Sequence, residues 1–133
     1  MGVGTVITNN GLKLAMHRIF DANPVYTPPN SFEVGVGTAT PTFNDTALGS
    51  PINIGSNVSQ SVVSGYPVYD NTNMVVQSEG IILTTQCNGN NISEFGLVNQ
   101  DSTPVLFSHC VFNAINKTNA VQLVFIEKDV IQT

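Results

Sequence analysis

Charge is the property that this chain has least of. Only 10% of its 133 residues are Asp, Glu, Lys or Arg, against about a quarter in average soluble proteins. Four side chains are cationic, Lys13, Arg18, Lys117 and Lys128, and the net charge is −5. Phosphate backbones and anionic lipid surfaces bind clustered Lys and Arg. The scattered cations therefore predict no nucleic-acid partner and no binding to anionic membranes.

Long apolar runs and a secretion signal are missing as well. No stretch reaches the ~20 apolar residues of a transmembrane helix, so no membrane insertion is expected. The first six residues lack the charged start and apolar core of a signal peptide. This predicts folding in a cytoplasm, where Cys87 and Cys110 would remain free thiols. Without secretion the Asn-x-Ser/Thr sequons have no role; they begin at Asn44, Asn57, Asn91 and Asn116.

The polar residues that replace charge are Asn, Thr, Ser and Gln, and they separate short apolar runs. Three such runs, 91–99, 104–112 and 121–126, have polar turns between them, which is typical of an antiparallel meander. Residues 31–37 alternate apolar and polar. We therefore predict a mainly β protein, an antiparallel β-sandwich of about seven strands, formed by a single domain over residues 11–133.

One short helix is expected near the amino terminus, over residues 11–20. Leu12, Met16, Ile19 and Phe20 share one helical face, which we expect to pack on the sheet. Asn9 or Asn10 could cap the start of this helix, and 21–24 ends it. Residues 1–10 are predicted to be an amino-terminal arm outside the domain.

Several details of the β region follow from the same patterns. The sequence Asn88-Gly89-Asn90-Asn91 is the strongest turn signal. Residues 74–83 are compatible with one bulged strand or with a hairpin. The expected core between two β layers consists of six apolar side chains: Phe95, Leu97, Leu106, Val111, Leu123 and Phe125.

No motif in the chain indicates a metal or cofactor site, so none is expected. Gly35-Val36-Gly37 lacks the third glycine and following helix of a dinucleotide fingerprint. His109 and Cys110 are neighbours in a strand and therefore point to opposite faces. We interpret Cys110 as a buried thiol that packs as a small hydrophobe.

Catalytic residues are not indicated either, and we expect no enzyme activity. The chain has no Gly-x-Ser-x-Gly motif, although a Cys87–His17–Asp triad remains open at this stage. Glu79 and Glu94 are the only plausible carboxylate pair. Glu94 is expected to be either a solvated outer-face residue or a partner of Lys117.

The order of several segments resembles small structural virion proteins of tailed bacteriophages. The segments are 11–14, Phe32 to Thr38, Asp45 to Gly49, Ile92 to Asn99 and 115–118. The family shows a "Val-Gly-Thr-Gly" strand end, an "Asp-Thr-Ala-Leu" segment and a late "Ile-x-Glu-x-Gly-Leu-Phe-Asn" strand followed by "Lys-Thr". The match covers roughly residues 11–127 and departs at Ala39 and Val98.

The resemblance implies a non-enzymatic structural role in a virion made in the host cytoplasm: tail fibre, baseplate, neck or head decoration. The implied partners are other virion proteins and further copies of the chain. The alternative is a carbohydrate- or receptor-binding module at a fibre tip, with a host-surface glycan as ligand. The predicted contact residues lie in the arm and in two loops, 26–30 and 66–70: Val3, Val6, Ile7, Tyr26, Pro28, Pro29, Tyr66 and Tyr69.

Overall fold

The computed structural model describes residues 4–130, which form nine β-strands and one α-helix. This confirms the predicted mainly β, sandwich-like fold with one short helix. The elements in chain order are β1 Gly4–Ile7, α1 Asn9–Phe20, β2 Ser31–Gly35, β3 Pro51–Ile52, β4 Ser59–Ser61, β5 Val68–Asp70, β6 Val75–Ile82, β7 Asn91–Val98, β8 Ser108–Asn116 and β9 Leu123–Val130.

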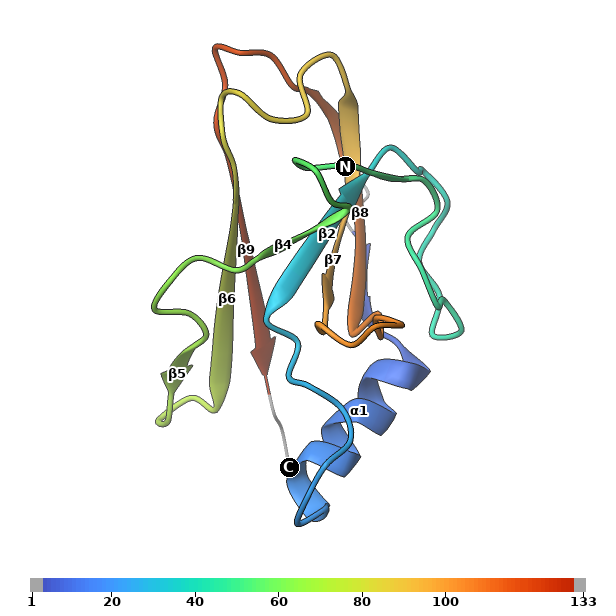
Figure 1. The fold of residues 1–133 in the computed structure, drawn as a ribbon, viewed down its shortest axis with the longest axis vertical. Coiled ribbons are helices and arrows are strands. Elements are labelled where there is room, and N and C mark those ends of the chain that lie inside the picture. Colours follow the sequence, from blue (N-terminus) through green and yellow to red (C-terminus); the bar gives the residue numbers. More distant parts are fainter. Residues whose placement is uncertain (1–3, 131–133) are drawn as a thin grey trace.

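The strands form two antiparallel sheets that face each other (Figure 1). Sheet A has the order β1-β8-β7-β2-β3, with β4 also paired to β2. Sheet B has the order β5-β6-β9. In Figure 1 sheet B forms the left side of the molecule, sheet A lies to its right, and α1 lies below sheet A.

The predicted three-stranded meander is correct for two strands and wrong for the third. β7 and β8 form an antiparallel hairpin, but β9 crosses to sheet B and pairs with β6 over its whole length. The 74–83 ambiguity is resolved in favour of one continuous strand, β6. The turn at Gly89 forms as expected, with this glycine at a φ of +86°.

The core between the sheets is centred on stacked aromatic rings. Phe95 stacks on Phe32 at 5.7 Å and on Phe125 at 5.0 Å between ring centroids. Phe95 and Leu97 are buried here as predicted, whereas Leu123 and Phe125 are half-buried.

The two other predicted core residues lie on the opposite face of sheet A. Leu106 is buried in a separate small cluster with Leu48 and Val98. Val111 is half-buried and sits opposite Glu94 in the β7–β8 register. The predicted sandwich core was therefore wrong for these two, because the outer face of sheet A is itself covered by the segment 36–50.

The amino-terminal segment is part of the domain, which corrects the predicted arm. Residues 4–7 form β1 and pair with β8, opposite Ser108 to Val111. The helix begins at Asn9, and its N-cap is Thr8, whose hydroxyl accepts from the Gly11 backbone N–H. Asn9 and Asn10 are therefore helical residues and not caps.

Candidate functional site

The outer face of sheet A carries a buried charged cluster centred on Glu94 of β7. The Glu94 side chain is 1% exposed and accepts hydrogen bonds from three backbone N–H groups. The donors are Gly37 at 2.9 Å, Gly49 at 2.9 Å and Ser50 at 2.7 Å. One carboxylate therefore fixes both ends of the 36–50 segment against sheet A.

His109 of β8 completes the cluster from the neighbouring strand. Its Nε2 lies 2.9 Å from Oε1 of Glu94, and its Nδ1 lies 2.7 Å from Oδ2 of Asp45. The His109 ring thus lies between two carboxyl groups, one on sheet A and one in the 36–50 segment, and links them through both of its nitrogens.

The hydrogen bonds keep both carboxylates ionised in spite of burial. Burial alone raises the pKa of Glu94, but the bonds from Ser50, Gly49, His109 and Gly37 outweigh it and lower the pKa below its usual value. Asp45 behaves in the same way. Burial raises its pKa, and hydrogen bonds from Thr42 and His109 lower it further than burial raises it.

The cluster explains two glycines that resemble a phosphate loop in the sequence. A Cβ on Gly37 would lie 2.5 Å from Oε2 of Glu94, and one on Gly35 would collide with the same carboxylate and with the Ser50 carbonyl. The glycines therefore leave room for the Glu94 side chain. Both expected roles of Glu94, a solvated residue and a partner of Lys117, are wrong.

This arrangement acts as a brace. Both ring nitrogens of His109 are engaged by carboxylates, so neither is free to take a proton from a hydroxyl or thiol as a general base would. Sequence reasoning singled out Glu94 but missed Asp45 and His109 as its partners. The glycines at 35, 37 and 49 indicate a close approach of this segment to Glu94, but they do not identify Asp45 or His109.

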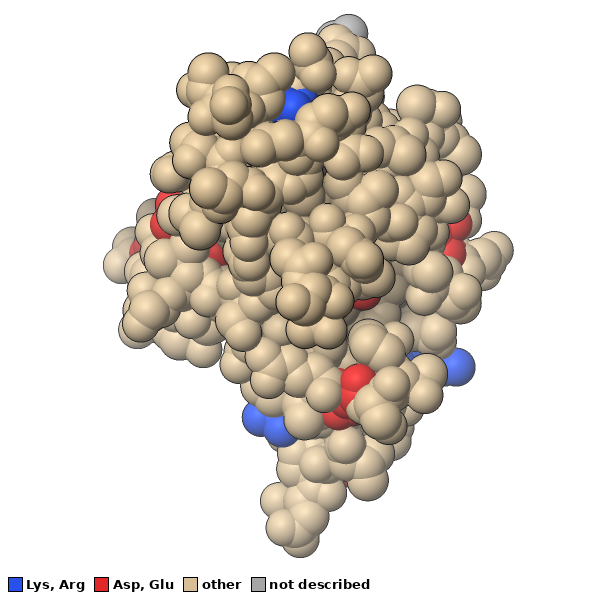
Figure 2. All heavy atoms as spheres, turned by 45° about the horizontal axis from the view of Figure 1, so that its top comes forward, with Lys and Arg blue, Asp and Glu red and all other residues tan. Residues whose placement is uncertain are grey.

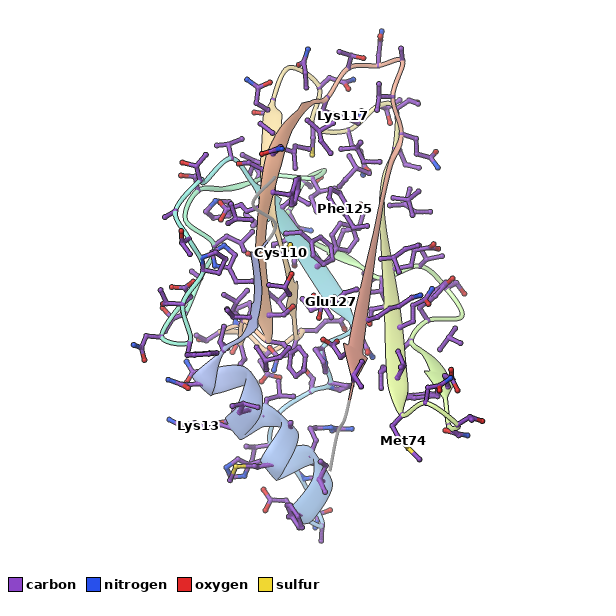
Figure 3. All side chains as sticks on the ribbon, turned by 180° about the vertical axis from the view of Figure 1, so that it is seen from behind. Lys13, Met74, Cys110, Lys117, Phe125 and Glu127 are labelled. Atoms are coloured by element: carbon purple, nitrogen blue, oxygen red, sulfur yellow. The ribbon has the colours of Figure 1, made fainter. Side chains whose placement is uncertain are left out.

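Lys117 is a second buried charge, at the end of the molecule opposite α1 (Figure 3). Its ammonium group donates to Asn88 Oδ1 at 2.8 Å and to the Thr118 carbonyl at 2.9 Å. A longer bond of 3.4 Å reaches the Thr84 carbonyl. Lys117 therefore holds the β6–β7 connection in place.

Glu127 of β9 is the third buried ionisable group, and it lies between the sheets (Figure 3). Its Oε1 accepts from the Ser108 hydroxyl at 2.6 Å, while Oε2 has no hydrogen-bond partner among the described residues. Burial, followed by the neighbouring Asp129, raises the pKa of Glu127 to about 9. Glu127 is therefore protonated at neutral pH.

The structure does not bring together the catalytic pairs left open by the sequence. His17 lies on α1 and bonds Asp21, whereas Cys87 lies in the β6–β7 connection at the other end of the molecule. Glu79 and Glu94 belong to different sheets. Within residues 4–130, no group of three or more His, Cys, Asp or Glu side chains is placed to hold a metal ion.

The two cysteines are unpaired in the structure, and both thiols are half-buried. Cys110 faces the space between the sheets on the same side of β8 as Ser108 and Phe112 (Figure 3). Burial raises the pKa of its thiol. The interpretation of Cys110 as a small apolar side chain fits this position, although it is less buried than expected.

The predicted contact residues fall in separate places. Val6 and Ile7 are half-buried in β1, and Val3 lies outside the described residues. Tyr26 is half-buried, 5.3 Å from the His17 ring, and its carbonyl accepts from Arg18. The remaining four are distributed along the chain: Pro28, Pro29 and Tyr66 are half-buried, and Tyr69 is exposed on β5, which is a strand and not the predicted loop.

The surface that sequence reasoning missed is the apolar face of α1, formed by Leu12, Met16, Ile19 and Phe20. These side chains are 52%, 59%, 69% and 82% exposed. The helix packs through its other side, where Leu14 is buried and Gly11 lies against the Phe107 backbone. The expectation that the apolar face packs on the sheet is therefore wrong.

A second exposed apolar surface is the outer face of sheet B. It contains Val68, Val124, Ile126 and Val130, all about half-exposed. The β6–β9 register places Glu79 beside Ile126 and Gln77 beside Lys128 on this same face. The face is therefore apolar with a few charges, and no described segment covers it as 36–50 covers sheet A.

The surface hollows are shallow. One, of about 330 Å³, lies on the outer face of sheet B and is lined by Val68, Asp70, Asn73, Val75, Gln77 and Lys128. The Asp70 carboxylate is already occupied by Thr72 and Asn73 of its own turn. The ring of Tyr69 belongs to the opposite face of the strand, because Tyr69 pairs with Val76.

Comparison with protein-family models, with curated proteins and with solved structures finds no match to this chain. Across residues 4–130, no helix combines the length and apolar character needed to cross a membrane. The functional argument therefore depends on the surfaces and charges of the chain itself.

Proposed function

We propose that this chain is a non-enzymatic structural subunit that works through protein–protein contacts, in the manner of the phage virion proteins that its sequence resembles. The observation that carries the proposal is the exposed apolar face of α1. Four large apolar side chains in one row, more than half exposed, mark a binding surface in soluble proteins.

The low surface charge supports the same function. Figure 2 shows a surface made mostly of uncharged residues, with a few separate Lys, Arg, Asp and Glu side chains. Desolvating charges is costly when they are not paired, and the centres of protein interfaces are depleted of them. A subunit that buries much of its surface in an assembly therefore benefits from this composition.

The test is the mass of the purified chain in solution over a range of concentrations, alone and with isolated particles that lack it. A defined oligomer, or saturable incorporation into particles, supports the proposal. A chain that stays monomeric and also binds no particle contradicts it.

A second candidate function is glycan binding at the hollow on the outer face of sheet B. The observation in its favour is the group of polar side chains there, Asn73, Gln77 and Lys128. Sugar sites usually add an aromatic ring, and Tyr69 faces the other way. Binding on a glycan array that is lost in Asn73→Ala would favour this function over assembly.

A further inference from the structure

We propose that copies of this chain assemble head to tail, with the apolar face of α1 in one copy docked on the outer face of sheet B in the next. This rests on the proposed structural function and names the partner as a second copy of the same chain. Size, charge and direction of the two surfaces carry the inference.

The exposed apolar area on α1 is large enough to indicate a binding surface. The apolar face of α1 is formed by four large side chains, Leu12, Met16, Ile19 and Phe20, which are between 52% and 82% exposed. Together these four side chains expose on the order of 500 Å² of apolar surface, near the upper end for the largest patch of a monomer. Burial of such an area is favourable by about 25 cal/mol per Å².

The outer face of sheet B matches this helix in kind and in length. Its apolar residues Val124, Ile126 and Val130 lie on one face of β9, with Lys128 between the last two. A helix of 12 residues is about 18 Å long, and a strand of 8 residues spans about 26 Å. The strand pair β6–β9 is therefore long enough to receive the whole of α1.

Charge favours α1 on sheet B over α1 on α1. The helix and its C-cap carry Lys13, Arg18 and Asp21, which gives this region a net charge of +1. Because the whole chain has a net charge of −5, the rest of the chain has a net charge of −6. The outer face of sheet B has two acids, Asp70 and Glu79, against one cation, Lys128. A symmetric helix pair would instead bring together the cations of two copies.

The direction of the two surfaces makes the contact heterologous. In Figure 1 α1 lies below sheet A, while the outer face of sheet B looks away from sheet A on the left. One copy cannot cover its own sheet with its own helix. When α1 of one copy binds sheet B of another, the pair still has one unoccupied α1 face and one unoccupied sheet B face. Further copies can therefore add until a ring closes or a filament forms.

The face of sheet B is a better docking surface than its open edge. Among the described residues β9 pairs only with β6, so its other edge could accept a strand. However, this edge strand carries Lys128 on its outer face, and a charged Lys on an edge strand discourages strand addition.

Two surface variants and their mixture test the proposal. The α1 variant is Met16→Lys/Ile19→Lys, and the sheet variant is Val124→Lys/Ile126→Lys. All four positions are exposed, so both proteins should fold, which circular dichroism checks. Thr46→Lys/Ala47→Lys, in the exposed part of the 36–50 segment, is a control of equal charge change.

We expect the wild type and the control to form multimers by sedimentation velocity, and each variant alone to be monomeric. In a mixture the intact helix of the sheet variant meets the intact sheet of the α1 variant. The altered surfaces repel each other, so assembly should stop at a 1:1 dimer. This stop at two copies is specific to a head-to-tail contact.

Other outcomes overturn the proposal and separate it from the proposed function. If the sheet variant still forms multimers, sheet B is not the partner, although assembly as such stands. If the mixture stays monomeric while the wild type assembles, the contact is not α1 on sheet B. If the wild type is monomeric at all concentrations, copies do not join through these faces, and only incorporation into particles can then support the structural function.

Discussion

The outer faces of the two sheets differ in whether the chain itself covers them. Sheet A is covered by its own chain, because the 36–50 segment lies across it and is fixed by hydrogen bonds to Glu94 and, through Asp45, to His109. Sheet B leaves Val124 and Ile126 about half-exposed on its outer face. The same chain thus seals one face with buried charge and leaves the other open and apolar.

The difference shows where stability and where binding should be sought. A face that is covered from within the chain contributes to folding, so changes there should unfold the protein. A face that is left open contributes little to the folding of one copy, so changes there should affect association. Matched substitutions on the two faces therefore separate the two roles.

The largest effect is expected at the centre of the covered face. Glu94→Gln places an amide where four N–H groups meet a buried carboxylate, three from the backbone and one from His109, so the NH2 group of Gln would face donors without an acceptor. We expect a loss of about 3–5 kcal/mol in the free energy of unfolding, measured by urea denaturation. Glu79→Gln on the open face is the control and should stay within about 0.5 kcal/mol.

The same substitution should change the acid limb of the stability curve. The pKa of Glu94 is lower in the folded protein than in the unfolded chain. Its contribution is therefore present above the ordinary carboxyl pKa and lost as pH falls through the folded pKa. Wild-type stability should decline in acid more steeply than that of Glu94→Gln; equal slopes would show that Glu94 is not a buried anion.

A smaller loss is expected from crowding the Glu94 carboxylate. In Gly37→Ala the new Cβ would lie 2.5 Å from Oε2, and the carboxylate cannot turn away without breaking its bonds to the 36–50 segment. We expect a cost of about 1–3 kcal/mol by thermal or urea unfolding. In Gly49→Ala the nearest atom lies 3.6 Å away, so that variant should be close to wild type.

The buried acid between the sheets should show the opposite dependence on pH. The pKa of Glu127 is raised to about 9, so the folded state binds its proton more tightly and wild-type stability falls as pH rises from about 4.5 towards 9. Glu127→Gln keeps an acceptor for Ser108 and removes the titration. We expect it to be more stable than wild type by at least about 1 kcal/mol at pH 8, with the difference shrinking towards pH 5.

The sequence predicted the fold class because hydrophobic alternation is a local property. It identified the β7–β8 hairpin from two apolar runs and a polar turn, and it placed Phe95 and Leu97 in the core. It failed at β9, because alternation does not say which sheet a strand joins. It also failed at β1, where four residues are too few to show a period.

The charged cluster was out of reach for a different reason. Asp45 and His109 are 64 residues apart, and nothing local marks them as partners. The helix was misread because its apolar face was assumed to point inward. Periodicity shows that a face is apolar, but it does not show whether the same chain covers it.

The smallest effect on stability is expected at the exposed apolar face of α1. Comparing it with the packed side of the same helix tests whether this face is exposed. Met16→Ala removes an exposed side chain and places a better helix former on the surface, so the stability of the isolated, dilute monomer should change by less than about 0.5 kcal/mol. Leu14→Ala on the packed side should cost about 2–5 kcal/mol. Both are measured by urea denaturation at a concentration where the protein is monomeric. If Met16→Ala costs as much as Leu14→Ala, the apolar face of α1 is buried within one copy and is not an exposed surface available for binding.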